Sequence, residues 1–262
     1  MRHAFLIIAH NEFGVLRRLV SMLDSEGNDI YVHYDLKVRT LPVVTTKASR
    51  LFVVPKRIDV RWGTVSQIAA ELTLFEAALK NGEYDFYHLV SGTHLPLKSM
   101  EEMDSFYQSH KRREVMRVWE EDPGDADFKI RRYHLFNGNI KSGHDLAWRI
   151  ILKIQKLFGI RHLKKETFIK TDNWKSITQK AAEYLVENKA EILRKYRRSL
   201  CGDEYYAASE LAKYPGLFRI ENCPELLYVE FDHESPLEIS LDRYEELRKT
   251  GYIWGRKFTE RI

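Results

Sequence analysis

The stretch YDFYHLVSGTHLPLK, residues 84–98, decides the fold that we predict for this chain. Its first seven residues mix aromatic and aliphatic side chains with little alternation, which is typical of a strand buried on both faces of a sheet. Such a strand lies in the middle of an open α/β sheet, where ligands bind beyond the carboxyl ends of the strands. We therefore expect the residues that follow the strand to lie at the lip of a ligand crevice, namely Ser91, Gly92, Thr93 and His94.

Two further strands are predicted near the start of the chain, at residues 3–9 and 29–33, with an amphipathic helix between them. Together they form a β-α-β unit of Rossmann type. Polar residues again follow the strands, with His10 and Asn11 after the first and Asp35 after the second. The sequence has no Gly-x-Gly-x-x-Gly turn and no P-loop, which disfavours a Rossmann dehydrogenase and a P-loop kinase.

Strands and helices alternate over the rest of the chain. Strands are expected at residues 50–54, 114–119 and 218–231, and helices at about 64–80, 100–110, 146–158, from TDNWKSIT to 198, and 202–211. Thr64 or Ser66 could cap the helix at 64–80, and the helix that follows TDNWKSIT is expected to be one long helix. The Pro/Gly/Asp segment EEDPGDADF, residues 120–128, is interpreted as a solvated loop. The whole chain, residues 1–262, is predicted to form one α/β domain with a mixed sheet flanked by helices.

The composition is that of an ordinary globular protein, with 262 residues, 44% hydrophobic residues and a net charge of +4. No apolar run approaches the roughly 20 residues that a membrane-spanning helix needs. Cys201 and Cys223 form neither a disulfide framework nor a metal-binding spacing, so we expect buried thiols in a reducing compartment. Basic clusters at 110–113, 161–165 and 194–198 indicate solvated helix faces, an anionic membrane or a phosphate-bearing ligand. No nucleic-acid-binding signature accompanies them.

Eight motifs, in this order along the chain, resemble the core-2/I-branching N-acetylglucosaminyltransferase and peptide-O-xylosyltransferase family. They are IIAHN (7–11), IYVHYDLK (30–37), VRWGTVSQIAAELTLFEAAL (60–79), YHLVSGTHLPLK (87–98), NWKSIT (173–178), DE (203–204), SPLEISLD (235–242) and GRKF (255–258). The resemblance implies a GT-A-like glycosyltransferase that inverts the anomeric centre, uses a UDP-sugar and needs no metal ion or other cofactor. It implies a nucleotide-sugar-binding half at about 1–120 and an acceptor-binding, catalytic half at about 121–262.

The resemblance implies that Glu204 is the catalytic base. An acceptor hydroxyl is a poor nucleophile, so an inverting displacement needs a general base within hydrogen-bond reach of it. From the residues alone, Asp203 could instead be a helix N-cap and Glu204 a first-turn partner of the helix dipole. Lys257, with Arg256 beside it, matches the family's lysine in the x-Lys-Phe motif, which takes the place of a metal at the leaving diphosphate.

The resemblance also implies donor and acceptor contacts. Trp62 aligns near the family's aromatic contact to uracil, and Asp35 could bind the base or the ribose. The predicted donor-binding set is completed by His10, Asn11, Ser91 and Gly92. The predicted acceptor-binding set consists of Arg132, Glu121 and Trp174.

Two residues depart from the family's pattern. His94 stands where the family commonly has the aspartate of Ser-Gly-x-Asp, and Leu227 stands where the family has an arginine before the terminal strand's tyrosine. The donor sugar is therefore left open between N-acetylglucosamine and xylose.

Two functions are alternatives to a metal-independent inverting glycosyltransferase. Asp125-Ala126-Asp127 spells the Asp-x-Asp pattern of a metal-dependent GT-A transferase, whose carboxylates would hold Mn²⁺ or Mg²⁺. Such a motif should follow a buried central strand, whereas Asp125 falls in the predicted loop. The second alternative is a non-catalytic protein that binds a saccharide or nucleotide sugar, since a fold does not fix a function.

The expected setting follows from the start of the chain at its first predicted strand. Eukaryotic relatives have a membrane anchor in the secretory pathway, so we expect a bacterial-type cytoplasmic enzyme of capsule or surface polysaccharide synthesis. Its expected partners are a UDP-sugar and a saccharide or lipid-linked saccharide acceptor, with no nucleic acid. The basic clusters could hold the enzyme peripherally on the anionic inner membrane.

Overall fold

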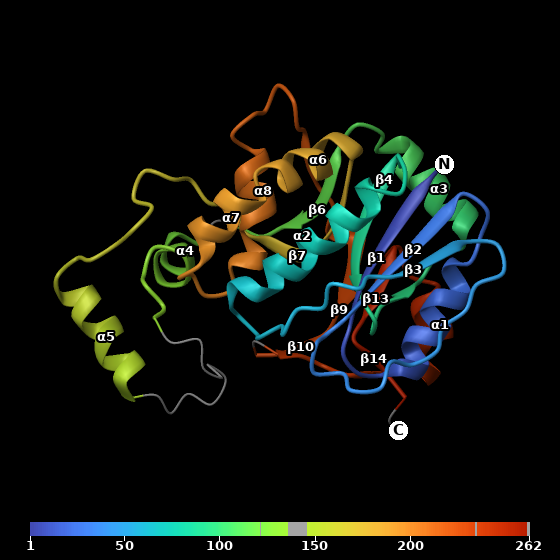
Figure 1. Ribbon diagram of the computed structural model, residues 1–262, viewed down its shortest axis with the longest axis horizontal. Coiled ribbons are helices and arrows are strands. Elements are labelled where there is room, and N and C mark those ends of the chain that lie inside the picture. The colour runs from blue at the N-terminus through green and yellow to red at the C-terminus, as the bar shows by residue number, and fades with distance from the viewer. Residues whose placement is uncertain (121, 136–145, 234, 261–262) are drawn as a thin grey trace.

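The computed structural model describes residues 1–120, 122–135, 146–233 and 235–260 (Figure 1). Over these residues, the largest sheet has seven strands in the order β3-β2-β1-β4-β7-β6-β8. Helices cover both of its faces (Figure 1). The predicted fold class, a mixed α/β sheet flanked by helices in one domain, is confirmed.

The first four strands of the sheet run parallel to one another. They are β1 (His3–Ala9), β2 (Asn28–Tyr34), β3 (Arg50–Val53) and β4 (Phe86–Ser91). Ile8 of β1 is in register with His33 of β2 and with Ser91 of β4, so these three strands end at the same edge. β4 is the fourth of the seven strands and each of its residues is buried, as its unalternating apolar sequence predicts.

Helices on the two faces contact neighbouring residues of β4. On one face, Phe75 of α2 (Val65–Leu79) packs against Tyr87. On the opposite face, Tyr107 of α3 (Met100–Ser109) packs against His88. Consecutive strand residues point to opposite faces, so one strand anchors both helix layers. The first crossover helix is α1 (Phe13–Leu23).

Three strands from later in the chain complete the sheet. β7 (Thr171–Ile177) lies between β4 and β6 (Glu114–Val118) and runs antiparallel to both, and β8 (Ile220–Asn222) pairs with β6 in parallel. The sheet thus crosses the expected boundary near residue 120, and the two halves form one continuous core. The helices that follow β7 are α6 (Gln179–Glu187), α7 (Lys189–Tyr196) and α8 (Tyr206–Leu211).

The structure corrects several sequence-based expectations. Thr171–Ile177, expected to open a long helix, form strand β7, and the strand expected at 218–231 is interrupted by a 3-10 helix at Pro224–Leu226. Where a loop is expected at 120–128, the chain forms helix α4 (Pro123–Lys129), because Pro123 occupies the first turn and the Asp122 side chain accepts hydrogen bonds from the N–H groups of Gly124 and Asp125. Where one long helix is expected, α6 and α7 are separated at Asn188, whose side-chain amide donates to the carbonyl of Tyr184. At the start of α2, Thr64 rather than Ser66 is the cap.

Short strands from the C-terminal part of the chain lie beside the main sheet. β5 (Leu95–Pro96), β13 (Trp254–Arg256) and β9 (Leu227–Val229) form a small sheet in that order. The other short strands are β10 (Phe231–Asp232), β11 (Ser235–Pro236), β12 (Ile239–Ser240) and β14 (Phe258–Thr259). The remaining helices within the described residues are α5 (Leu146–Leu157), α9 (Tyr244–Leu247), η2 (Gly202–Glu204), η3 (Pro224–Leu226) and η4 (Leu241–Arg243). No helix among the described residues is long and apolar enough to cross a membrane.

A buried carboxyl group at the start of β6 makes the stability of the fold depend on pH. Both oxygens of Glu114 accept hydrogen bonds from Thr178, the N-cap of α6, at 2.8 Å. Burial raises the pKa of Glu114 from 4.5 to about 7, against the effect of the Thr178 hydrogen bonds. Between these two values the folded protein keeps a proton that the unfolded chain loses, so the free energy of unfolding falls as pH rises, by up to about 3 kcal/mol.

The variant Glu114→Gln should remove this loss, because an amide can accept from the Thr178 N–H and donate to its hydroxyl without ionising. We expect urea unfolding at pH 8 to show a variant about 1 to 3 kcal/mol more stable than the wild type, with no difference at pH 4. Glu187→Gln, at the exposed end of α6, is the control and should change neither value. An equal effect of Glu114→Gln at both pH values would contradict the assignment.

Candidate active site

The polar residues predicted to line a crevice meet at the edge where β1, β2 and β4 end. The Asp35 N–H donates to the carbonyl of Ala9, and the Gly92 N–H donates to the carbonyl of Ile8, each at 2.9 Å. His10 is exposed by its total surface area, but protein atoms surround part of its ring. This burial lowers the pKa of His10. The charges of four residues also act on that pKa, namely Asp35, Lys257, Lys37 and Arg256. Most of the predicted donor-binding residues therefore come together here.

Asp35 organises the loop that carries Trp62. Its carboxylate is buried and accepts hydrogen bonds from the backbone N–H and the Nζ of Lys37, at 2.8 and 2.9 Å. The same Nζ contacts Asp59 at 2.9 Å and the carbonyl of Val60 at 2.6 Å. The end of β2 thus fixes residues 59–60, two positions before Trp62, whose side chain is 47% exposed. An exposed indole at this place can present its face to a nucleotide base.

The residues after β4 form a closed turn. The Nδ1 atom of His94 accepts from the Ser91 N–H at 3.0 Å and lies 2.8 Å from the Ser91 hydroxyl, which also bonds to Thr93. The pKa of His94 is well below its usual value because the ring is buried and because Arg256 is nearby. The ring is therefore neutral and completes the hydrogen bonding of the turn.

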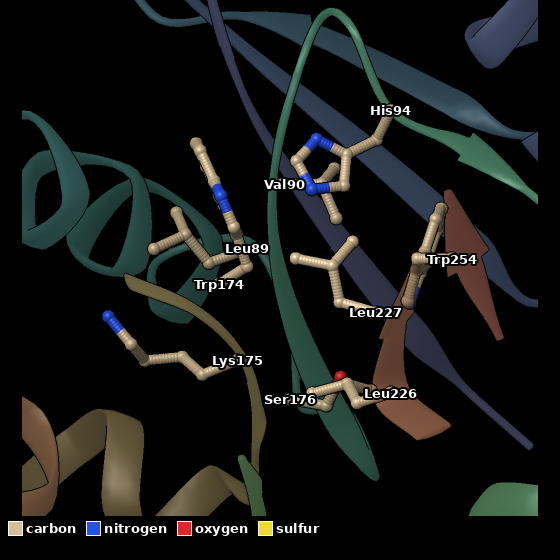
Figure 2. A pocket seen from close by; sticks show the side chains of 9 residues that line it. All are labelled: Leu89, Val90, His94, Trp174, Lys175, Ser176, Leu226, Leu227 and Trp254. Carbon is tan, nitrogen blue, oxygen red and sulfur yellow. The ribbon is translucent and has the colours of Figure 1, made fainter. Parts of the chain in front are cut away.

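His94 points into the interior rather than into the crevice. Figure 2 shows its ring beside Trp174 and Trp254 around a small, mostly apolar pocket, which has room for about one water molecule. The His94 and Trp174 rings meet edge to face at 4.7 Å. Leu227, the other departure from the family's pattern, lines the same pocket. A sugar nucleotide cannot enter this space, so both of these residues belong to the packing of the interior.

Arg256 and Lys257 stand next to this turn. The Phe258 N–H donates to the carbonyl of Thr93 at 2.9 Å, which holds the preceding lysine beside residues 91–94. The Lys257 Nζ is 3.1 Å from Glu238 and a quarter exposed. The lysine thus remains accessible from the edge of the sheet.

Arg256 is partly exposed by surface area, yet protein surrounds its guanidinium closely. It lies 5.0 Å from the centre of the Trp174 ring, and its buried Nε has no hydrogen-bond partner among the described residues. Burial lowers the pKa of Arg256 to about 10, against the effect of Asp172. The part of a desolvated guanidinium that remains exposed can donate to the oxygens of a phosphate.

Glu204 lies at the same edge, across the first residues of β7. Its backbone carbonyl accepts from the Thr171 hydroxyl at 3.3 Å, and its Oε2 atom is 3.1 Å from the Nζ of Lys129. The side chain is about one third exposed, and no described residue donates to Oε1. Burial lowers the pKa of Lys129, but the surrounding charges, with Glu204 first among them, raise it overall. The ion pair therefore orients a partly accessible carboxylate.

The turn that carries Glu204 also contacts the loop of Trp62. The Cys201 N–H donates to the carbonyl of Gly63 at 2.8 Å. Asp203 is buried and accepts from the Gln67 amide of α2 at 3.0 Å. Asp203 is therefore not the helix N-cap that its position could suggest, and α8 begins after Tyr205. Burial, followed by the charges of Glu204 and Glu71, raises the pKa of Asp203 well above its usual value.

A buried ion pair behind this turn was not anticipated from the sequence. The Nζ of Lys175 is 2.9 Å from Glu71, and both side chains are fully buried. The Tyr206 hydroxyl donates to the same Glu71 oxygen at 2.8 Å, and its ring centre is 4.9 Å from the Lys175 Nζ. The sequence contained one sign of this pair: Lys175 in NWKSIT and Glu71 in VRWGTVSQIAAELTLFEAAL are charged residues among apolar ones. Charged residues are rarely buried unless they are paired.

The Asp-x-Asp pattern does not form a shared metal site. Asp125 and Asp127 are two positions apart on α4, so their side chains point about 200° apart around the helix axis. Asp125 contacts Lys129, Lys170 and Tyr205, whereas Asp127 contacts Arg132 and Arg161. No group of metal-binding side chains occurs among the described residues. Two carboxylates paired with separate cations are poorly placed to hold one ion together.

The predicted acceptor-binding residues are not gathered in one place. Arg132 is buried and donates to Asp127 and to the carbonyl of Ile160, so it holds α4 against the segment after α5. Trp174 is buried, and the Arg256 guanidinium lies over its ring. Glu121 lies outside the described residues. Trp119, 41% exposed, donates its indole N–H to Asp172 at 2.9 Å.

The sequence matches the family described as Core-2/I-Branching enzyme over residues 3–217. The chain belongs to this family. The predicted membership is confirmed, and with it the prediction that the protein is a glycosyltransferase. The match ends before GRKF, so the roles of Arg256 and Lys257 depend on the geometry above. No curated protein matches the sequence. Among solved structures, the apo form of mouse xyloside xylosyltransferase 1 is similar, with a TM-score of 0.42 and 8% identity over 97% of this chain and 96% of that chain.

The buried ion pair of this glycosyltransferase predicts a large stability effect. Lys175→Met should lower the free energy of unfolding by about 3 to 5 kcal/mol, because it leaves the Glu71 carboxylate buried without its cation. The double variant Lys175→Met/Glu71→Gln should recover most of this loss, since the amide carries no charge and still accepts from Tyr206. Urea unfolding of the three proteins is the measurement. A double variant no more stable than Lys175→Met would contradict the pairing.

Proposed function

We propose that this glycosyltransferase moves a sugar from a UDP-sugar to a hydroxyl of a saccharide acceptor, inverting the anomeric centre without a metal ion. The proposal rests on two oppositely charged residues, Arg256 and Glu204, that lie on either side of the first residues of β7. Arg256 lies over Trp174, and the backbone of Glu204 is bonded to Thr171. Thr171 and Trp174 face opposite sides of the sheet, so the cation and the carboxylate flank the edge at which β7 begins.

Arg256 and Lys257 supply positive charge to the leaving diphosphate. Negative charge builds up on the diphosphate as its bond to the sugar breaks, and a fixed cation beside it lowers the barrier. Arg256 offers a desolvated, partly exposed guanidinium, and Lys257 offers a partly exposed ammonium 3.1 Å from Glu238. The exposed face of Trp62 supports stacking with uracil, and the Asp35–Lys37 pair supports contact with the ribose.

Glu204 supplies the base. With Oε2 held by Lys129, Oε1 faces no donor among the described residues and can accept the proton of an acceptor hydroxyl. The acceptor oxygen then forms a bond to the anomeric carbon while the bond from that carbon to the diphosphate oxygen breaks. UDP leaves with the electron pair, and attack from the opposite face inverts the configuration. The donor sugar in this proposal is N-acetylglucosamine or xylose, and the setting is bacterial surface polysaccharide synthesis.

The variant Glu204→Gln tests the base. A thermal-shift screen of UDP-sugars first identifies the donor by the stabilisation it gives. We expect the variant to bind that donor with the wild-type affinity and to release UDP about 100- to 10,000-fold more slowly. Glu187→Gln, the same change on the exposed end of α6, is the control and should retain wild-type turnover. Wild-type turnover by Glu204→Gln would show that another group is the base.

Chelation tests the absence of a metal from the reaction. We expect the rate of UDP release in excess EDTA to equal the rate without it, because Arg256 and Lys257 neutralise the negative charge of the leaving diphosphate. Activity that EDTA abolishes and Mn²⁺ restores would instead support the metal-dependent alternative.

A further inference from the structure

Helix α5 lies at the periphery of the molecule, away from the main sheet (Figure 1). Its inner face is attached by a few specific contacts. The Trp148 indole N–H donates to Nδ1 of His134 at 3.3 Å, and the Gln155 amide bonds to the backbone N–H and carbonyl of Tyr133 at 2.7 and 3.0 Å. These contacts fix which side of the helix faces outward.

The outward side carries a stripe of large apolar residues. Its members are Leu146, Ile150, Ile154 and Leu157, which are 70%, 46%, 45% and 79% exposed. Their spacing of four, four and three residues places them within about 80° of one another around the helix axis. Phe158, directly after the helix, is 71% exposed. A contiguous apolar stripe of this kind on a water-soluble surface marks an interaction site.

A stripe of cations runs beside the apolar stripe. Arg149, Lys153 and Lys156 are all exposed, and the helix sequence LAWRIILKIQKL contains no acidic residue. Lys164 and Lys165, shortly after the helix, are exposed as well. The basic clusters at 110–113 and 194–198 lack this combination, because no large exposed apolar residue lies within them. The structure therefore singles out α5 among the basic segments.

We propose that α5 lies in the surface of an anionic lipid bilayer, with its apolar stripe among the acyl chains and its cations on the lipid phosphates. An apolar stripe flanked by lysine and arginine is the arrangement that interfacial helices use. The charge pattern selects this occupant, since pairing with a second copy of the chain would set cations against cations. This inference does not depend on the proposed reaction, and it concerns a part of the chain separate from Glu204 and Lys257.

Co-sedimentation with vesicles tests the proposal. We expect the full chain to bind vesicles of equal parts phosphatidylcholine and phosphatidylglycerol, to bind phosphatidylcholine vesicles far less, and to dissociate as salt is raised. The variant Arg149→Gln/Lys153→Gln/Lys156→Gln should weaken partitioning on the order of 100-fold. The variant Ile150→Gln/Ile154→Gln/Leu157→Gln should weaken it at least about tenfold, even at low salt.

The matched control is Lys111→Gln/Lys180→Gln/Lys249→Gln, which removes the same charge from exposed positions away from α5. It should bind anionic vesicles nearly as well as the wild type, and circular dichroism should show that every variant is folded. Binding that both α5 variants leave unchanged, or no preference of the wild type for anionic vesicles, would overturn the proposal. Self-association in sedimentation equilibrium that the apolar variant abolishes, without vesicle binding, would instead assign the stripe to a contact between copies.

Discussion

β7 runs antiparallel between β4 and β6, and its hydrogen bonds to both strands bring its first residues to the edge where the parallel strands end. Alternate residues of a strand face opposite sides of the sheet. Thr171 accordingly meets the turn of Glu204, and Trp174 meets Arg256 on the other side. One reversed strand thus places a candidate base and a candidate phosphate cation around a common edge.

The charged side chains at this edge are positioned by contacts with residues far away in the sequence, not by their neighbours along the chain. Glu204 pairs with Lys129, and its turn is bonded to Gly63 of the loop that carries Trp62. Behind them, the Lys175–Glu71 pair fills the space between β7 and α2 without exposed surface. Such a pair contributes little net stability but is costly to break, so it restricts how β7 and α2 can pack. The side chains at this edge are therefore backed by a buried ion pair between β7 and α2.

Local patterns in the sequence predicted the elements well where burial was uniform. The unalternating residues of β4 indicated the central strand, and polar residues after β1, β2 and β4 indicated the edge at which they meet. The helix α4 was missed because Pro, Gly and Asp usually mark a turn, whereas here Asp122 and Pro123 start a helix. The break at Asn188 was missed because the apolar periodicity continues through it.

The candidate site was predictable only where a motif identified it. Glu204 and Lys257 were found through the resemblance, but Lys129 lies 75 positions from its partner Glu204, and no local pattern reports such a contact. His94 illustrates the converse, since its position in a site motif suggested a ligand contact and the structure buries it against Trp174. Side-chain direction at the end of a strand depends on packing from distant segments, here β13 and β7.

In the proposed reaction, Arg256 and Lys257 bind the diphosphate in place of a metal. Calorimetric titration of UDP and of uridine, both in EDTA, measures this directly. We expect the wild type to bind UDP more tightly than uridine, and Lys257→Ala to lose much of this difference while its affinity for uridine is unchanged. Lys249→Ala, at an exposed position, is the control. Equal affinities for UDP and uridine in the wild type, or a preference that Lys257→Ala retains in full, would contradict the account.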